Sequence, residues 1–433
     1  MKVAIAGTGY VGLGSAAVLA HIGHTVTCVD VDSTKIESLR RGECPIFEKG
    51  LPELLAEGRE RMSFTTDYRP AYRDADVIIV AVGTPEKADG SANLTYVFSV
   101  AEQIAESVEA PCVVAMKSTV PIGTNDKIEE HIRKHLTHDV PVTVVSNPEF
   151  LSQGTAVHDM LHAYRIVVGT DDPRARERMS ELYRPLNQPF VFTDRRSAEM
   201  IKYASNDFLA LRISYINEIA NLCERLGANV EDVAYGMGLD PRIGPKFLQA
   251  GVGYGGSCFP KDTQALHWLS SYYDYEIKTV KAAIEVNESQ KLRLIKKARR
   301  YYDRLDGLTV AVLGLTFKPG TDDLREAPSL DNVPILLDDG AHVRTWDPCG
   351  VERFKKRVSG DIVYCDTPKE ALHGADLCMI FTEWPEVKAL TPEDFLTMKK
   401  PIILDGRNCF KPDAMAAYPL VYDSIGRRRV NNL

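Results

Sequence analysis

The stretch KVAIAGTGYVG, residues 2–12, decides the fold class of this chain. A short apolar run precedes glycines at positions 7, 9 and 12, and an alanine-rich segment to His21 then has the composition of a helix. The pattern G-x-G-x-x-G between a strand and a helix is typical of a dinucleotide-binding turn. The segment HTVTCVD, residues 24–30, predicts the second strand of a βαβ unit. We therefore expect a doubly wound sheet with a nucleotide at the carboxyl ends of its parallel strands.

The end of that second strand indicates which dinucleotide binds. Asp30 stands eighteen residues after Gly12, and no arginine follows it directly. A carboxylate at this place accepts hydrogen bonds from the ribose hydroxyls and repels a 2'-phosphate, so NAD is favoured over NADP. Two later strand ends carry threonines, Thr84 in VGTP and Thr119 in KSTVP. Each is either a contact to cofactor or substrate or an ordinary strand terminator.

The rest of the chain repeats the opening pattern after a helical middle. Between Ser197 and Leu226 there is neither Gly nor Pro, and the spacing predicts one long helix that joins two domains and offers a dimer contact. Its apolar residues recur at Ile201, Ala204, Phe208, Leu211, Tyr215, Ile219, Leu222 and Leu226. The segments TVAVLG (309–314) and HVRTWD (342–347) then predict a second α/β unit.

The predicted fold class is therefore α/β, with two Rossmann-like doubly wound domains joined by a long central helix. We place an NAD-binding domain at residues 1–195, a central helical region that carries a cysteine loop at 196–300, and a second Rossmann-like domain at 301–433. A length of 433 residues suits two or three domains.

Composition excludes several classes of protein. A net charge of -8 argues against a general binder of nucleic acid or of membrane surfaces. No run of 18 apolar residues predicts a membrane span, and the early glycines disfavour a secretory signal. Nine cysteines without a C-x-x-C pair favour a reducing cytoplasm over a disulfide framework or a zinc site. We expect no metal site, because the helically spaced histidines lack an HExxH arrangement: His131, His135, His138, His158 and His162.

The loop GVGYGGSCFPKD, residues 251–262, carries the strongest candidate for chemistry. Four glycines let a backbone press against a ligand, and Cys258 is either a nucleophile or a small buried residue, as Cys28 and Cys112 are expected to be. Lys202 and Asn206 stand four apart on the predicted helix and share a face. They form either an oxyanion site for a carbonyl attacked by Cys258 or a solvated face.

Nine motifs in order resemble the UDP-glucose 6-dehydrogenases, within the UDP-glucose/GDP-mannose dehydrogenase family, over essentially the whole chain. They are GTGYVG (7–12), VGTP (82–85), KSTVP (117–121), NPEFL (147–151), EMIKYASNDFLA (199–210), DPRIG (240–244), GYGGSCFPKD (253–262), LGLTFKPGTDDLREAPS (313–329) and DGRN (405–408). The resemblance implies oxidation of UDP-glucose to UDP-glucuronate with two NAD and one water, which supplies glucuronate for cell-surface polysaccharide. It also implies a cytoplasmic homodimer or higher oligomer built through the long helix.

The resemblance assigns roles to individual residues. Cys258 holds the substrate as a thiohemiacetal and then a thioester, Lys202 and Asn206 stabilise oxyanions, and Asp262, with a water near Thr119, assists proton transfer and hydrolysis. Glu149 lies near the sugar and that water. A second glutamate often found four residues later in the family is Gln153 here, and an amide cannot act as a base.

The resemblance also implies two sets of binding residues. The cofactor set is Gly7, Gly9, Tyr10, Val11, Gly12, Asp30, Lys35, Thr84, Thr119, Lys261 and Arg325. The substrate set is Glu149, Phe150, Leu151, Lys202, Asn206, Arg242, Phe247, Gly253, Tyr254, Gly255, Cys258, Phe317, Lys318 and Arg407, with Arg242 donated across the subunit interface. Alternatives are a dehydrogenase of GDP-mannose or UDP-N-acetylmannosamine, a two-electron 2-hydroxy-acid dehydrogenase that needs no Cys258, and a non-catalytic nucleotide-sugar sensor.

Overall fold

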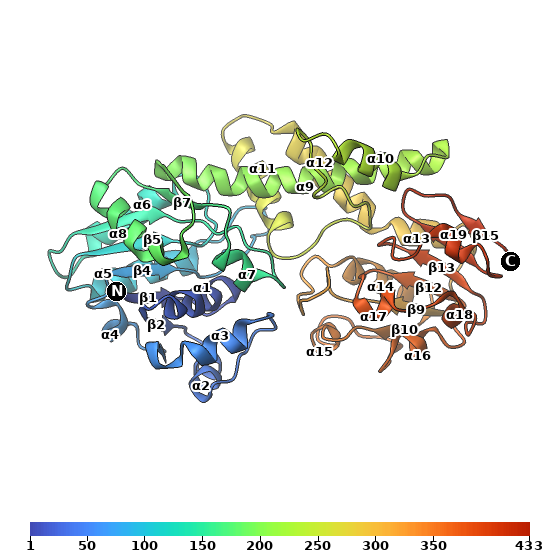
Figure 1. Cartoon of the computed structure of the whole chain (residues 1–433), viewed down its shortest axis with the longest axis horizontal. Coiled ribbons are helices and arrows are strands. Elements are labelled where there is room, and N and C mark those ends of the chain that lie inside the picture. The colour runs from blue at the N-terminus through green and yellow to red at the C-terminus, as the bar shows by residue number, and fades with distance from the viewer. The chain divides into compact units, whose positions relative to one another are not determined.

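The computed structural model describes every residue from Met1 to Leu433. The chain forms two compact units, Met1–Ser205 and Asn206–Leu433. Each unit contains one twisted sheet with helices around it (Figure 1). None of the helices combines the length and apolar character that a membrane span requires.

The N-terminal unit contains an eight-stranded sheet in the order β3-β2-β1-β4-β5-β6-β7-β8. Its strands are β1 (Lys2–Ala6), β2 (Thr25–Val29), β3 (Met62–Thr65), β4 (Val77–Val80), β5 (Cys112–Met116), β6 (Val142–Ser146), β7 (Ile166–Gly169) and β8 (Phe190–Thr193). All neighbours pair in parallel except β6 and β7. The order reverses between β1 and β4, the point at which doubly wound sheets bind nucleotides.

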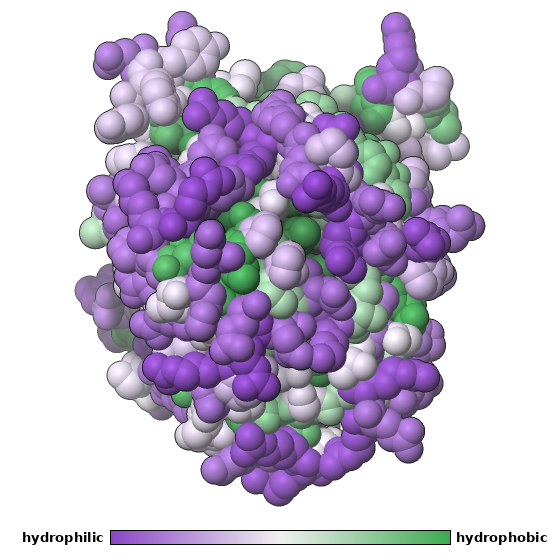
Figure 2. All heavy atoms as spheres, turned by 90° about the vertical axis from the view of Figure 1, so that its left-hand side faces the viewer, coloured by the Kyte–Doolittle hydropathy of each residue, from purple (hydrophilic) through white to green (hydrophobic).

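Helices follow most of these strands, and their apolar faces form the core on both sides of the sheet. They are α1 (Tyr10–His21), α2 (Ser33–Arg41), α3 (Leu51–Glu57), α4 (Tyr68–Tyr72), α5 (Thr95–Ser107), α6 (Thr124–His135), α7 (Ala156–Leu161) and α8 (Pro173–Tyr183). In the view of Figure 2 hydrophilic side chains predominate, and the hydrophobic areas are small and scattered.

The C-terminal unit repeats this topology with a seven-stranded sheet in the order β11-β10-β9-β12-β13-β14-β15. Its strands are β9 (Thr309–Leu313), β10 (His342–Trp346), β11 (Ile362–Tyr364), β12 (Leu377–Ile380), β13 (Ile402–Asp405), β14 (Val421–Ser424) and the antiparallel β15 (Val430–Asn431). Its helices beside the sheet are α14 (Pro328–Asp338), α15 (Val351–Phe354), α16 (Pro368–Leu372), α17 (Pro385–Lys388), α18 (Pro392–Phe395) and α19 (Pro412–Met415). The predicted fold class is confirmed.

The turn after β9 repeats one detail of the turn after β1. Thr8 donates its backbone N–H and its hydroxyl to Asp30, and Thr316 donates the same two groups to Asp347 at the end of β10. Asp347 also accepts the indole N–H of Trp384 at 3.0 Å. The carboxylate of Asp347 in the second unit is therefore occupied by hydrogen bonds from the protein itself.

The predicted long helix is α9 (Arg195–Leu226), one uninterrupted helix of 32 residues (Figure 1). Its predicted apolar stripe is not its buried face: Phe208, Tyr215 and Leu222 are 58%, 49% and 50% exposed. The buried face is instead rich in polar side chains, namely Glu199, Lys202, Asn206, Asp207, Ser214 and Asn217. The helix α9 therefore buries polar side chains on one face and exposes apolar ones on another.

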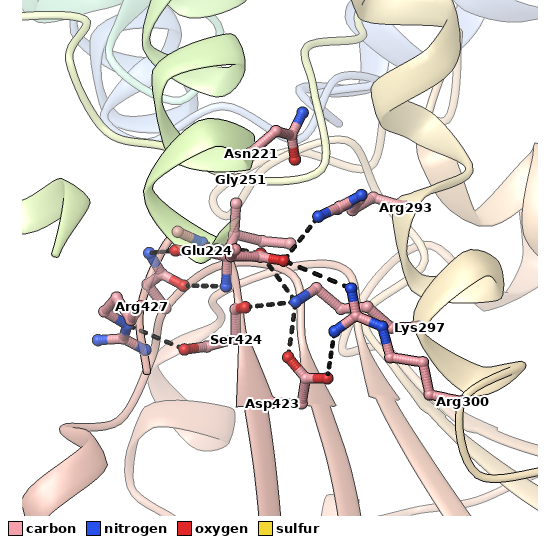
Figure 3. A network of polar contacts seen from close by, with 12 residues as sticks. Asn221, Glu224, Gly251, Arg293, Lys297, Arg300, Asp423, Ser424 and Arg427 are labelled. Atoms are coloured by element: carbon pink, nitrogen blue, oxygen red, sulfur yellow. Dashed lines mark hydrogen bonds and ion pairs between the residues drawn. The ribbon is translucent and has the colours of Figure 1, made fainter. Parts of the chain in front are cut away.

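The remaining helices of the C-terminal unit are α10 (Val230–Gly238), α11 (Phe259–Tyr272), α12 (Lys278–Lys291) and α13 (Arg293–Ala298). A buried ionic network joins the end of α9 to α13 and β14 (Figure 3). Lys297 Nζ lies 2.8 Å from Glu224 and 2.6 Å from Asp423, and Arg293 binds Glu224 at 2.6 Å. The network attaches the second half of α9 to its sheet.

Candidate active site

The three glycines of the first turn have three different structural roles. Gly7 has a φ of +98°, and a Cβ there would lie 2.6 Å from the carbonyl oxygen of Ala81. A Cβ at Gly12 would overlap the carbonyl oxygen of Gly7. Gly9 has no protein atom within 4 Å of its Cβ position. The turn therefore leaves open space beside the start of α1, where Tyr10 and Val11 are half-buried and a pyrophosphate fits.

Asp30 is prepared to remain charged beside this turn. It accepts hydrogen bonds from the backbone N–H and hydroxyl of Thr8, at 2.8 and 2.5 Å, and from Asp32 N–H at 3.0 Å. Burial disfavours its charged form, but these bonds and the nearby charge of Lys35 hold the pKa of Asp30 below its ordinary value. A half-buried carboxylate at this place suits ribose hydroxyls.

Thr84 and Thr119, the two threonines predicted at strand ends, are in contact. Thr84 Oγ1 donates to the carbonyl oxygen of Thr119 at 2.9 Å. Glu199 on α9 accepts the backbone N–H groups of Gly123 and Asn125, at 2.5 and 2.9 Å. It thereby holds the loop that follows Thr119, a role that the sequence did not reveal.

Glu149 and Lys202 form a buried ion pair in the N-terminal unit. Lys202 Nζ donates to Glu149 Oε1 at 2.9 Å and to the Glu149 carbonyl oxygen at 2.7 Å, and Glu149 Oε2 accepts the N–H of Leu151 at 2.7 Å. Lys202 also lies 5.4 Å from the centre of the Phe150 ring. Gln153 is buried nearby in the sequence, with no hydrogen-bond partner for its Oε1. The solvated-face alternative for Lys202 is thus wrong.

In the C-terminal unit, Asn206 and the loop helix α11 share a second polar cluster. Asn206 Nδ2 donates to Asp262 Oδ2 at 2.7 Å, and Lys261 pairs with Asp262 Oδ1. Asp262 is 1% exposed. Asn206 stands four residues after Lys202 in the sequence of α9.

Cys258 occupies the N-cap position of α11 and is half-buried. Ser257 Oγ lies 3.6 Å from its sulfur. A helix N-terminus favours a thiolate. Cys28 and Cys112 lie instead within strands, and burial raises the pKa of each to about 12. Among these thiols, Cys258 has the position of a nucleophile.

The glycines of the cysteine loop have protein atoms close to their Cβ positions, so close packing within the protein requires them. A Cβ at Gly253 would lie 2.6 Å from Asn287 Oδ1, and one at Gly256 would lie 2.8 Å from the Phe317 ring. At Gly255 a Cβ would overlap the carbonyl oxygen of Glu326. The side chain of Asn287 further bonds both backbone groups of Tyr254, at 2.8 and 3.0 Å. The loop is therefore rigidly packed.

Several predicted substrate residues surround this loop. Arg407 donates to the carbonyl oxygens of Gly253 and Phe317, each at 3.1 Å. Phe247 has a φ of +62°, a strained conformation typical of functional sites. The rings of Phe247 and Tyr254 both pack edge-on against Phe259.

The remaining predicted residues lie near the surface. Lys318 lies 5.5 Å above the Phe317 ring, and Arg325 binds Asp323 through two nitrogens. Arg242 is 87% exposed and pairs with Asp240 at 2.6 Å.

Known proteins resemble this chain over its whole length. Sequence models of the UDP-glucose/GDP-mannose dehydrogenase family match residues 1–187 as the NAD binding domain, 196–289 as the central domain and 311–412 as the UDP binding domain. A UDP-glucose 6-dehydrogenase of Bacillus subtilis is 47% identical over 99% of this chain and 98% of its own length. Another from Rhizobium meliloti is 48% identical over 99% of this chain and 100% of its own length.

Solved structures agree with this relation. A UDP-glucose dehydrogenase from Pyrobaculum islandicum superimposes with a TM-score of 0.90 at 36% identity, covering 94% of each chain. A UDP-N-acetylmannosamine dehydrogenase from Pyrococcus horikoshii gives a TM-score of 0.86 at 28% identity, covering 100% of each.

Proposed function

Because this chain belongs to the UDP-glucose/GDP-mannose dehydrogenase family, we propose that it oxidises UDP-glucose to UDP-glucuronate in two NAD-dependent steps on Cys258. The observation that carries the mechanism is the position of Cys258 at the N-terminus of α11, one turn before the Asp262 carboxylate that Asn206 holds. A nucleophile is required because an aldehyde has no second hydride to release until a tetrahedral adduct forms.

The N-terminal unit supplies the residues that we assign to NAD binding. The open space at Gly9 and the carboxylate of Asp30 fit NAD, which accepts a hydride from C6 in each oxidation when it is bound. Thr84 and Thr119 line the strand ends of the same sheet, next to the switch point. We assign cofactor binding to residues 1–195 on these grounds.

The thiolate of Cys258 adds to the C6 aldehyde and gives a thiohemiacetal oxyanion. Lys202 and Asn206 then stabilise that oxyanion from consecutive turns of α9. Loss of the second hydride leaves a thioester, and water opens it with proton transfer to Asp262 or Glu149, releasing the Cys258 thiolate. The amide of Gln153 takes no part in that proton transfer.

The sugar nucleotide is assigned to the loop and sheet of the C-terminal unit. Arg407 fixes the carbonyls of Gly253 and Phe317, and Tyr254, Phe247 and Lys318 lie on the same loops. We assign residues 196–300 to the helical region that carries the cysteine, and 301–433 to UDP recognition. The cysteine composition supports a cytoplasmic enzyme.

A panel of nucleotide sugars tests the choice of substrate. Purified protein with NAD should form NADH with UDP-glucose and show at least tenfold lower kcat/KM with GDP-mannose and UDP-N-acetylmannosamine, an expected margin of about 1.4 kcal/mol or more. Faster turnover of either competitor would overturn the substrate, and no turnover with any of them would indicate a sensor.

Asp30→Ala is expected to raise KM for NAD about 10- to 100-fold, because a charged hydrogen bond to the ribose contributes about 1.5–3 kcal/mol. The change in KM for NADP should be smaller. Asp67→Ala is the matched control, since Asp67 caps α4 after the neighbouring strand β3 and belongs to neither set of binding residues. Steady-state kinetics with both cofactors make the comparison. An unchanged KM for NAD in Asp30→Ala would remove Asp30 from cofactor binding.

The exposed apolar face of α9 supports a homodimer, with Arg242 of one chain reaching the site of the other. Leu222→Glu should convert a dimer into a chain of 48.1 kDa in light scattering or ultracentrifugation. Val363→Glu, at an equally exposed position on β11, should leave the dimer intact. Wild-type protein that sediments at 48.1 kDa would contradict this assembly.

A further inference from the structure

One buried acid next to the proposed catalytic set has no role in the mechanism above. Asp207 follows Asn206 on α9 and is 4% exposed. Neither of its carboxyl oxygens has a hydrogen-bond partner in the protein. Buried carboxylates are normally paired or hydrogen-bonded, because an isolated buried charge costs several kcal/mol. Asp207 is therefore an exception to the pairing of buried carboxylates, and it lies next to the proposed catalytic set.

The charged groups that act on Asp207 come from α11. They are Asp262, which opposes its ionisation, and Lys261, which favours it. Burial has the largest effect, and together with Asp262 it raises the pKa of Asp207 to about 8. The charge of Asp207 also acts on Tyr254 of the cysteine loop. Burial raises the pKa of Tyr254 to about 12, so Tyr254 keeps its proton below that pH. On α12, Lys291 and Glu288 act on Tyr254 as well.

The charge balance explains why the protonation of Asp207 matters. With Asp207 neutral, Lys261 and Asp262 form a balanced pair, and Asn206 completes the hydrogen bonding of the Asp262 carboxylate. With Asp207 ionised, two carboxylates share a single ammonium in a buried place. The unbalanced charge is unfavourable, and the ammonium is attracted to both acids.

Resting on the function proposed above, we propose that Asp207 is a positioning residue that must keep its proton during turnover. Its neutral form leaves Lys261 and Asn206 on Asp262, so that this carboxylate stays aimed for proton transfer. Its ionised form competes with Asp262 for Lys261, so the Asp262 carboxylate is no longer held in place. Turnover is therefore lost at alkaline pH.

The pH profile of kcat between pH 6 and 10 tests this role. Wild type should lose about tenfold in kcat per pH unit above a midpoint near 8. Asp207→Asn keeps the size and the neutral state, so its kcat at pH 7 should stay within about twofold, and its alkaline limb should move up by a pH unit or more. Asp303→Asn, an exposed acid remote in sequence, is the control and should follow wild type.

Thermal melting gives a readout that needs no turnover. The pKa of Asp207 is higher in the folded chain than its ordinary 3.8, so its contribution to the free energy of unfolding is lost as pH rises through about 8. The melting temperature of wild type should fall more between pH 6 and 9.5 than that of Asp207→Asn. Asp207→Ser serves as a second neutral variant if the asparagine fails to fold.

The outcomes separate the two proposals. No oxidation of UDP-glucose by wild type at any pH overturns the proposed function. Turnover by wild type with an identical alkaline limb in Asp207→Asn overturns the positioning role alone. A changed melting profile with an unchanged limb does the same, because it leaves Asp207 as a merely structural acid.

Discussion

Cys258→Ser is expected to lower steady-state kcat by about 1,000-fold or more while leaving NAD binding intact. A hydroxyl at the N-terminus of α11 is a far weaker nucleophile than a thiolate, so neither the hemiacetal nor the activated acyl intermediate forms at a useful rate. The proposed NAD site is in the N-terminal unit, around Gly9 and Asp30. Steady-state rates of NADH formation and NAD titration followed by fluorescence make the two measurements.

Cys44→Ser is the matched control for this loss. Cys44 is also half-buried, but its thiol donates to the carbonyl oxygen of Ile46, and burial raises its pKa. Its replacement should leave kcat within about twofold, as expected for a residue outside the chemistry. Normal turnover by Cys258→Ser would remove the thiol from the mechanism.

Lys202→Met should lower kcat about 100- to 1,000-fold, the usual effect of removing one oxyanion donor. It should also lower the free energy of unfolding by about 3–5 kcal/mol, because Glu149 is left charged and buried without its partner. Measuring kcat at a temperature at which the variant remains folded separates the two effects.

Lys297→Met provides the comparison for the stability effect. Lys297 is equally buried and pairs with Glu224 and Asp423 in the network of Figure 3. This variant should lose similar stability yet keep its kcat when folded, since the network lies outside the proposed chemistry. If Lys202→Met kept wild-type kcat, the oxyanion role of Lys202 would be refuted.

The fold was predictable because its signals are local. The G-x-G-x-x-G turn, Asp30 and the second α/β pattern follow from neighbouring residues, and Gly7 and Gly12 have the close contacts that such a turn requires. Cys258 was likewise predictable as a reactive thiol, because it stands in the glycine-rich stretch GVGYGGSCFPKD. These features depend on short stretches of chain.

The parts that the sequence did not predict depend on residues far apart in the chain. The spacing on α9 identified an apolar stripe, but only the packed structure shows that Lys202, Asn206 and Asp207 are buried while Tyr215 is exposed. The packing that requires glycine in the cysteine loop was not predicted, because the contacting residue Phe317 follows some sixty residues later in the chain. Burial of Asp207 had no signal in the sequence.

The ratio of NADH formed to UDP-glucose consumed tests the central claim most directly. Both quantities are followed in one reaction at limiting sugar, NADH by absorbance and UDP-glucose by chromatography. A covalent acyl intermediate on Cys258 requires both oxidations before release, so the account predicts two NADH per sugar with no free aldehyde. One NADH per sugar, with aldehyde as the product, would contradict it.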